Sequence, residues 1–478
     1  MSVETYLRSI TFSGGTAVDV PQSGVLVLVG PNNTGKSAAL REIQHHFTGH
    51  GRPADQPYRV ITAVDLAKEG DADDLREWLE EHSHAFTIRS SGERRYTRPG
   101  AQVMWGQAQG EWAIPNVLGP ALSGVFCFPA LTEQRLNLIA GASHWNPMEE
   151  SPSAPLQVLF AQPELEEQIS EIAREAFNAP LHLSRFPGGP IDLYVGTPVN
   201  EPSATSISDA YIEEIRTMPL LREQGDGMRS FVGIMLALLA ARYPIVLLDE
   251  PEAFLHPPQA RLLGRKIGSG SPSTQLVMAT HSTDTLVGLL SSGSTDVTVV
   301  RVTRHGDVNP VSVLPPDQLR QLWSDPLLAS SNLLDGLFHR GVVLSEGDTD
   351  ARYYGAVLDH DKGDAAHELF FTHCGGKARM AMVIRALHAL DVPVVAIVDF
   401  DALREEGRVR GIVEALGQDW SRFTRDWTII NAAVQDMSAA PDIVDAKETT
   451  SAAYDEAAAR GPRLTREASD KIRAANQG

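Results

Sequence analysis

The feature that most constrains the fold of this chain is the stretch GPNNTGKS at residues 30–37. An apolar run, GVLVLV, precedes it, and a segment of helical character begins at about Lys36. The glycines allow the backbone N–H groups to turn towards one point, where the start of a helix adds a partial positive charge. A strand, a glycine-rich turn and a helix in this order predict an α/β fold with the turn at the carboxyl edge of a parallel sheet.

The same stretch fits the spacing Gly-x-x-x-x-Gly-Lys-Ser, which is typical of loops that bind a nucleoside triphosphate. We expect Lys36 to neutralise the β- and γ-phosphates of ATP, and the Ser37 hydroxyl to ligate Mg²⁺. The nucleotide-binding residues that we expect in this loop are Asn32, Asn33, Thr34, Gly35, Lys36 and Ser37.

An acidic pair follows a second apolar run, PIVLLDEPE, which reads as a buried parallel strand. We expect Asp249 to contact the Mg²⁺ held by Ser37, and Glu250 to orient or deprotonate an attacking water. The pair could instead cap a helix that begins near Pro251, but the phosphate-binding loop upstream favours the nucleotide interpretation.

Three further residues extend the expected nucleotide site. His281 follows the next apolar strand, in VMATHST, and we expect it to contact the γ-phosphate, although such a histidine can also be purely structural. Gly225 and Gly227 begin a long apolar helix in LREQGDGMRSF, where a glycine-rich start can bind phosphate or serve only as a turn. A glutamine-loop equivalent is a weaker prediction, around Gln134 and Arg135.

A second acidic pattern lies near the C-terminus. Glu346 and Asp350 follow the apolar run GVVLS, and Asp399 and Asp401 lie in VDFD after a later run, whereas Asp348 reads as part of a turn. Residues two apart in a strand point to one side, so these carboxylates can converge. They would repel one another unless cations lay between them, and oxygen ligands suit Mg²⁺ or Mn²⁺. Two such ions can support phosphodiester cleavage, although each acidic piece alone could be only a turn or a helix cap.

The alternation of strands and helices predicts two α/β units joined by a linker. We expect a larger domain at 1–315 with a helical insertion at about 155–225, a linker at 316–338, a smaller parallel-sheet domain at 339–440 and a helical tail at 441–478. The smaller domain is expected to contain four strands, the last of them DWTIINA at 426–432.

The two sets of motifs resemble known families. The phrase LLDEPEAFLHP and the Gly-Asp-Gly helix start resemble the overcoming-lysogenization-defect (OLD) nucleases, whose ATPase domain is of the ABC/SMC type. The glutamate after the first strand and the Asp-x-Asp after the third resemble a Toprim domain, and HCGGKARM is similar to the Gly-Gly-Lys turn of OLD-type Toprim units.

This resemblance implies a nuclease that depends on ATP and a divalent metal, Mg²⁺ or Mn²⁺, and acts in defence against phage or plasmids. It implies that Glu346, Asp350, Asp399 and Asp401 are metal ligands, and that Glu250, His281 and three of these carboxylates are catalytic: Glu346, Asp399 and Asp401. It further implies a homodimer in which Gly225 and Gly227 complete the nucleotide site of the other protomer. Nucleic acid is the expected partner, DNA rather than RNA, and a companion defence protein is left open.

One part of the OLD pattern has no clear counterpart here. The family has another acidic residue and a Lys or Arg further along the chain. The residues available for these roles are Asp436, Asp442, Asp445, Lys447, Glu448 and Lys471. An alternative function is therefore a non-nucleolytic ATPase sensor or scaffold whose Toprim unit binds a partner without cutting.

Composition narrows the remaining function classes. A formal net charge of −20 argues against a surface that is basic throughout, and the strongest basic cluster, at residues 87–100, reads either as a solvated hairpin or as a local nucleic-acid contact. The two cysteines form no zinc pattern, which disfavours a topoisomerase or a primase, and no apolar run is long enough to span a membrane. We expect a cytoplasmic location.

Overall fold

The structure is a computed structural model of the whole chain. It describes residues 3–49, 59–98, 100–146, 152–185, 189–200, 208–241, 243–270, 274–293, 296–314, 332–362, 368–376, 379–389, 391–436, 443–459 and 465–477.

The larger domain is built on a six-stranded sheet with the order β14-β13-β3-β12-β11-β8. Five strands are parallel and the edge strand β14 is antiparallel. The strands are β3 (Gly24–Val29), β8 (Cys127–Ala130), β11 (Ile245–Asp249), β12 (Gln275–Ala279), β13 (Asp296–Val302) and β14 (Val311–Leu314). Every residue of β3 is buried, as the continuous apolar run predicted. The predicted α/β class is confirmed.

Helix α1 (Lys36–Thr48) lies between this sheet and a second, antiparallel sheet of three strands. The second sheet has the order β2-β1-β4 and contains β1 (Glu4–Phe12), β2 (Ala17–Asp19) and β4 (Ile61–Glu69). The carboxylate of Glu42 on α1 accepts the backbone N–H groups of Arg59, Val60 and Ile61 at 3.1, 2.9 and 2.8 Å. These bonds fix the start of β4 beside the phosphate-binding loop.

A peripheral lobe covers the other end of the antiparallel sheet. Its elements are α2 (Ala72–His82), β5 (His84–Thr87), β6 (Arg94–Arg98), β7 (Ala101–Met104), α3 (Trp105–Trp112) and α4 (Pro120–Phe126). The basic cluster falls on the β5–β6 hairpin, where Arg94 pairs with Glu80 at 2.6 Å and the buried Arg98 donates to the carbonyls of Val125 and Ala241. Two of the four arginines in this cluster are therefore held by the protein itself.

The inserted region carries its own small hydrophobic core. Its elements are α5 (Thr132–Asn137), α6 (Pro155–Ala161), α7 (Pro163–Phe177), β9 (Leu181–Leu183), β10 (Leu193–Val195), α8 (Asp209–Thr217) and η1 (Leu221–Glu223). Helix α9 (Asp226–Met235) packs on α5 and α7 and continues as a π-helical segment over Leu236–Ala241. The two helices that flank the nucleotide site on the other side are α10 (Pro257–Gly268) and α11 (Thr283–Leu290).

The smaller domain has a three-stranded parallel sheet with the order β16-β15-β17. The strands are β15 (Gly341–Ser345), β16 (Leu369–His373) and β17 (Val394–Ala396). The flanking elements are η3 (Asn332–Phe338), α14 (Asp348–Lys362), α15 (Met380–Ala389), η6 (Phe400–Arg404), α16 (Glu406–Ala415), η7 (Trp420–Arg422) and α17 (Thr424–Asp436).

The predicted fourth strand, DWTIINA, is wrong, because these residues lie within helix α17. The β-branched residues favoured a strand locally, but tertiary contacts decide the conformation here. The Trp427 indole donates to the carbonyl of Leu403 at 3.0 Å and so docks the helix on η6, while Ile429 and Ile430 stay 60% and 40% exposed. The segment therefore packs on η6 and η7 as a helix rather than on a sheet edge.

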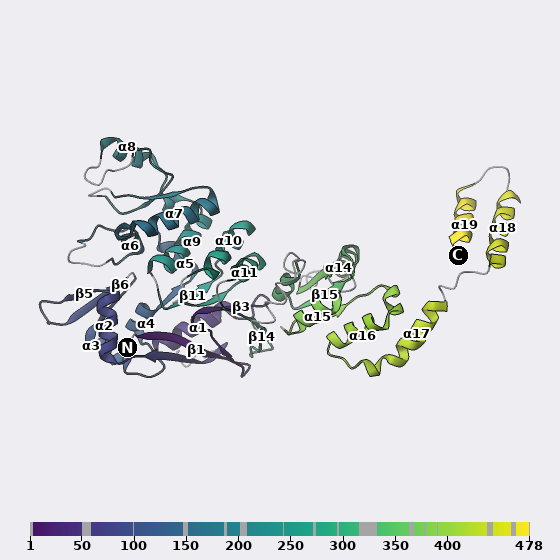
Figure 1. Cartoon of the computed structure of the whole chain (residues 1–478), viewed down its shortest axis with the longest axis horizontal. Helices are drawn as coiled ribbons and strands as arrows, with labels where there is room; N and C mark the ends of the chain where they lie inside the picture. The colour runs from purple at the N-terminus through teal and green to yellow at the C-terminus, as the bar shows by residue number, and fades with distance from the viewer. Residues whose placement is uncertain are drawn as a thin grey trace.

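The two domains adjoin where β14 and α11 meet η3 and α15 (Figure 1). One hydrophobic cluster continues across this junction, from Leu286 and Leu289 of α11 to Leu337, Val342 and Leu344 of the smaller domain. Of the expected linker, residues 316–331 lie outside the described part of the chain, and its last residues form η3.

The tail contains two helices, α18 (Ile443–Ala459) and α19 (Arg466–Gln477), which pack on each other. Among the described residues, no helix is long and apolar enough to cross a membrane.

Candidate nucleotide site and candidate metal centre

The phosphate-binding loop depends on backbone conformations that favour glycine. Gly30 has φ 139° and Gly35 has φ 92°, and Asn33 also lies in the left-handed region with φ 62°. A Cβ atom on Gly30 would lie 2.2 Å from the carbonyl oxygen of Val302 on β13. The sequence therefore places glycine where the loop turns and where it touches the neighbouring strand.

Lys36 is 3% exposed and lies inside the loop. Its Nζ donates to the carbonyl oxygens of Gly30 and Pro31 at 2.8 and 2.9 Å, which are atoms of the loop itself. Burial lowers the pKa of Lys36 to about 8, while the nearby Glu250, Asp249 and Glu252 act in the opposite direction. The ammonium group is thus weakly solvated, and a bound polyphosphate would stabilise its charged form.

Ser37 and Asp249 lie far apart in the sequence but are in contact in the structure. The Ser37 hydroxyl on α1 donates to Oδ1 of Asp249, at the end of β11, with a distance of 2.8 Å. Burial raises the pKa of Asp249, and the bond from Ser37 acts against that shift. A hydroxyl and a carboxylate are oxygen ligands, which fits the Mg²⁺ that we expected these two residues to share.

Glu250 and His281 lie on the open side of the same site. Nε2 of His281 is 3.5 Å from Oε1 of Glu250, and Glu250 itself has φ 44°. Burial, followed by the charge of Lys36, lowers the pKa of His281 to about 4, so the imidazole is neutral at pH 7. A neutral ring can donate one hydrogen bond to an anion without a proton being gained or lost.

Two buried charged residues support this arrangement from behind. Glu252 accepts the backbone N–H of His281 at 2.7 Å, and its Oε2 finds no hydrogen-bond partner among the described residues. Burial raises the pKa of Glu252. Arg135 is fully buried and donates through Nη1 to the carbonyl oxygen of Asp249 at 2.6 Å.

Sequence reasoning did not assign Glu252, although it is the second glutamate of the DEPE phrase. The exposed Gln134 stands beside Arg135, and of the two only Arg135 touches the site in this structure. The weaker prediction of a glutamine-loop equivalent around these residues stays a prediction.

The glycines at the start of α9 have different surroundings. A Cβ atom on Gly227 would lie 2.5 Å from the carbonyl oxygen of Phe254, so glycine is needed there for packing within the chain. Gly225 is the N-cap residue of α9, and a Cβ atom there would meet nothing within 4 Å. Only Gly225 therefore has open space next to it, and its expected phosphate contact stays a prediction.

A cavity of about 370 Å³ opens beside the phosphate-binding loop. It is lined by α1, the start of β4 and the β13–β14 turn, including Arg59, Arg304 and Asn309. Asn309 is buried and donates through Nδ2 to the carbonyls of Thr34 and Thr303 at 2.7 and 3.0 Å. The cavity continues from the expected phosphate position and is walled by groups that can hydrogen-bond or stack.

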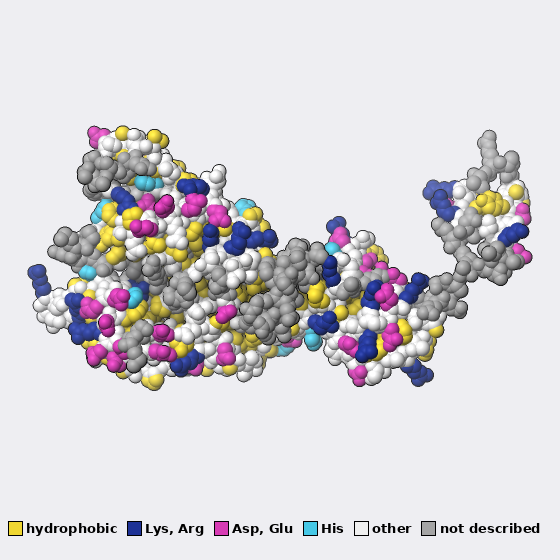
Figure 2. All heavy atoms as spheres, in the orientation of Figure 1, with side chains coloured by type: hydrophobic (Ala, Val, Ile, Leu, Met, Phe, Trp, Pro, Cys, Tyr) yellow, Lys and Arg dark blue, Asp and Glu magenta, His cyan; other side chains and the backbone are white. Residues whose placement is uncertain are grey.

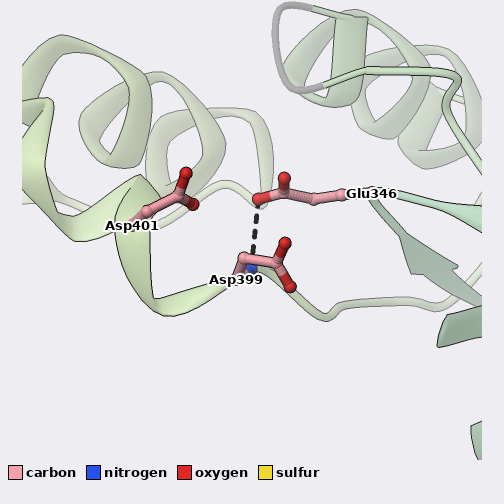
Figure 3. Close-up of side chains that lie close together, drawn as sticks. All are labelled: Glu346, Asp399 and Asp401. Atoms are coloured by element: carbon pink, nitrogen blue, oxygen red, sulfur yellow. Dashed lines mark hydrogen bonds between the residues drawn. The ribbon is translucent and has the colours of Figure 1, made fainter. Parts of the chain in front are cut away.

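The smaller domain brings three carboxylates together at the carboxyl edge of its sheet. One oxygen each of Glu346, Asp399 and Asp401 lie within 4.8 Å of one another, and Figure 3 shows the three side chains converging. Glu346 is 9% exposed and accepts the backbone N–H of Asp399 at 3.1 Å, whereas both aspartates are exposed. This oxygen-only set, open to solvent on one side, fits a hydrated Mg²⁺ or Mn²⁺ ion.

The convergence has a different cause from the one expected. Strand β17 ends at Ala396, and Asp399 is the N-cap residue of η6, so the two aspartates do not share a face of a strand. The turn brings them together instead. The backbone N–H of Ile397 donates to the carbonyl of Leu344 at 2.8 Å, which keeps the chain beside β15 up to this turn.

Asp350 is not one of the three carboxylates whose oxygens lie within 4.8 Å of one another. It lies in the first turn of α14 with its Oδ2 near Gly347, and its expected role as a fourth metal ligand stays a prediction. Asp348 was expected to belong to a turn, but it is the first residue of α14 and pairs with Arg352, one helical turn further on, at 2.8 Å.

The turn after β16 has the glycines it requires, since Gly375 and Gly376 have φ 66° and 130°. Lys377 and Asp442 lie outside the described residues, and the side chains of Asp436 and Asp445 are likewise not described. Lys471 pairs with Glu456 at 3.0 Å within the α18–α19 hairpin. None of these residues can be assigned to the missing downstream part of the site.

Two family models each match one segment of the chain. Residues 199–288 match an AAA domain family described as AAA domain, putative AbiEii toxin, Type IV TA system. Residues 337–401 match the overcoming lysogenization defect protein-like TOPRIM domain. No curated protein matches the chain.

Solved SMC head domains also align with the chain. An SMC head bound to the C-winged helix domain of ScpA has 13% identity, covers 66% of this chain and 99% of its own, and has a TM-score of 0.41. The SMC head domain from Thermotoga maritima has 13% identity, covers 66% of this chain and 100% of its own, and has a TM-score of 0.33. The SMC head with an extended coiled coil from Pyrococcus furiosus has 12% identity, covers 67% of this chain and 99% of its own, and has a TM-score of 0.36.

Each family match contains one of the two sites. The AAA match includes the acidic strand end at Asp249, and the TOPRIM match includes the carboxylate cluster at Glu346. The chain thus joins an AAA-type ATPase domain to a Toprim domain of the OLD kind, which is the domain architecture of the OLD family.

Proposed function

We propose that the protein is a nuclease that depends on a divalent metal and is controlled by ATP. The observation that carries this proposal is the cluster of Glu346, Asp399 and Asp401 at the open edge of the Toprim sheet. Three carboxylates so close together repel one another unless a cation is bound, so the cluster favours metal binding over a purely structural role.

In the ATPase domain, each residue has a task that follows from its position. Lys36 and the loop N–H groups would bind the β- and γ-phosphates, and Ser37 and Asp249 would hold Mg²⁺, which neutralises phosphate charge. Glu250 would orient the attacking water, with the neutral His281 beside it as a hydrogen-bond donor to the γ-phosphate. The cavity next to the loop has room for the base and ribose.

In the Toprim domain, exposure supports a polymeric substrate. Asp399 and Asp401 face solvent, so a phosphodiester in a long chain can reach them, while the buried Glu346 is held by the Asp399 N–H. The bound ions would activate water and stabilise the leaving oxygen. Lys, Arg, Asp and Glu side chains are interspersed on the face seen in Figure 2, so bound cations would have to offset the charge of the acids near the site.

One observation favours the alternative, a non-nucleolytic ATPase sensor or scaffold. The three carboxylates whose oxygens lie within 4.8 Å of one another do not include Asp350, whereas four were expected. A site with fewer ligands could bind a single ion and a nucleic acid without cutting it.

The two functions are separated by a nicking assay on supercoiled DNA and on single-stranded RNA, with Mg²⁺ or Mn²⁺ and with or without ATP. We expect metal-dependent nicking of DNA by the wild type and a loss of at least about 100-fold in Asp399→Asn, because a metal ligand is removed. The matched control is Asp359→Asn, an exposed aspartate on α14 outside the cluster. Equal activity of wild type and Asp399→Asn on every substrate would leave the sensor function as the better explanation.

The wider setting is part of the same proposal. We extend the proposal to a homodimer, a cytoplasmic location and a role in defence against phage or plasmids, and the match to an OLD-like TOPRIM domain supports this extension. A companion protein is left to be identified by purification of the natural complex.

A further inference from the structure

The loop that carries His281 touches the smaller domain directly. The His281 ring lies 6.5 Å from the ring of Phe338, centre to centre, with the planes tilted by 39°. Two residues further on, the Thr283 hydroxyl donates a hydrogen bond to the carboxylate of Asp335. Phe338 and Asp335 both belong to η3, so two side chains at the edge of the nucleotide site contact one short helix of the Toprim side.

Segment η3 leads without interruption into the metal centre. Segment η3 ends at Phe338, strand β15 begins three positions later at Gly341, and Glu346 follows the last residue of β15. Within η3 there is little room for adjustment, because a Cβ atom on Gly336 would lie 2.6 Å from Cγ2 of Val342, and Leu337 is 2% exposed. A shift of η3 must therefore be passed to β15 rather than absorbed locally.

A second connection fixes the amino ends of both strands that lead to the cluster. Arg301 on β13 is 1% exposed, and its two Nη atoms donate to the carbonyls of His339 and Asp391, each at 2.8 Å. His339 precedes β15 and Asp391 precedes β17. Strand β13 pairs with β3, the strand that ends at the phosphate-binding loop. The buried Arg301 side chain therefore joins the sheet of the larger domain to that of the smaller domain.

From these contacts we infer that η3 transmits the nucleotide state from the His281 loop to the carboxylate cluster, with Phe338 and the Thr283–Asp335 bond as the points of transmission. The inference rests on the proposed function, since it concerns how the ATPase domain regulates the Toprim site. A γ-phosphate that moves His281 must either displace Phe338 or break its contact, and packed interfaces respond by changing between discrete arrangements. Coupling of this kind typically changes an affinity 5- to 150-fold.

The test removes the transmitting contacts and leaves both sites intact. Thr283→Val deletes the hydroxyl at nearly constant shape, and Phe338→Leu removes the ring that faces His281. The matched control is Thr217→Val at the exposed end of α8, where the hydroxyl donates, within the described part of the chain, to the carbonyl of Glu214. ATP hydrolysis, nicking without nucleotide and nicking with ATP are measured for each protein.

We expect both variants to hydrolyse ATP and to nick without nucleotide within about 3-fold of wild type. The ratio of nicking rates with and without ATP, however, should fall towards 1 in both variants and stay at the wild-type value in Thr217→Val. A wild-type ratio that persists in Thr283→Val and Phe338→Leu would overturn the inference and leave the nuclease function standing. Absence of nicking by the wild type would instead count against the proposed function.

A binding measurement tests the coupling through η3 without depending on cleavage. Because coupling between two sites is reciprocal, DNA must change the affinity for ATP by the same factor by which ATP changes the affinity for DNA. With Ca²⁺ in place of Mn²⁺, the dissociation constant of a fluorescent ATP analogue is measured with and without a DNA duplex. We expect a clear DNA effect in the wild type and the control and none in Thr283→Val, and an equal effect in all three would refute η3 as the connection.

Discussion

At the scale of single residues, the nucleotide site is a set of buried charges held without full solvation. Lys36, Asp249 and Glu252 all have pKa values shifted towards their neutral forms, and burial is the largest cause in each case. Such shifts gather at functional sites, where a ligand supplies the missing charge. Here the negative triphosphate would stabilise the charged form of Lys36, and its bound cation would stabilise the charged forms of the carboxylates.

Lys36 gives a prediction about pH. Its pKa of about 8 lies below the usual lysine value because the ammonium is buried, and bound phosphate favours the charged form. Below pH 8 the lysine is already protonated, so ATP affinity should be constant. Above pH 8 binding must be accompanied by proton uptake, and the dissociation constant should rise up to about tenfold per pH unit. Titration of a fluorescent ATP analogue between pH 6.5 and 9.5 measures this slope.

The control for this slope is Lys36→Arg, because a guanidinium stays charged over the whole range. It should bind ATP more weakly at every pH and show no change of slope near pH 8. A slope that is the same in both proteins would mean that another group titrates.

At the scale of elements, two helices approach each other through glycines. A Cβ atom on Gly264 of α10 would lie 2.1 Å from the carbonyl oxygen of Thr285, and one on Gly288 of α11 would lie 2.0 Å from that of Arg261. The backbones of α10 and α11 are therefore in direct contact. Since α11 begins just after His281, this close crossing sets the position of the His281 loop.

A single methyl group tests this crossing. Gly288→Ala should destabilise the protein by roughly 1–3 kcal/mol, because a backbone carbonyl occupies the space of the new atom. Gly110→Ala in α3, where a Cβ atom would meet nothing within 4 Å, should instead stabilise it by about 0.5–1 kcal/mol. Urea unfolding of the whole chain compares the two, and equal midpoints would show that α10 and α11 can separate at little cost.

At the scale of the whole molecule, the proposed dimer would form through the start of α9. Gly225 has open space beside its Cα atom, whereas Gly227 is needed to pack against Phe254. Within the described part of the chain, no contact requires a glycine at position 225. A second protomer that presents a phosphate there would explain the residue.

Gly225→Asp tests the dimer without disturbing the helix. Aspartate is a favourable N-cap residue, so stability should hold, while its negative charge should repel a phosphate. In a Glu250→Gln background, chosen to slow hydrolysis, ATP should raise the mass measured by light scattering to that of a dimer. The mass should stay monomeric when Gly225→Asp is added, and a dimer that forms equally in both proteins would contradict the predicted role of Gly225.

Much of both sites follows from local sequence, because each motif lies where a strand meets a turn. The loop at residues 30–37 and the strand ends at Asp249 and Glu346 have positions that spacing and apolar runs determine. The strand predicted at 426–432 was wrong because a short β-branched segment gives no information about whether a sheet edge is available to receive it.

The sequence by itself determined that the chain has two parallel α/β sheets and an acidic cluster on the second, since strand periodicity and strand-end acids are local properties. The tertiary structure alone decided which carboxylates meet, because the turn that begins η6 brings Asp399 and Asp401 to Glu346. It also placed Glu252 behind His281 and Phe338 in front of it. Contacts between segments far apart in the chain depend on how whole elements pack, and no local spacing encodes them.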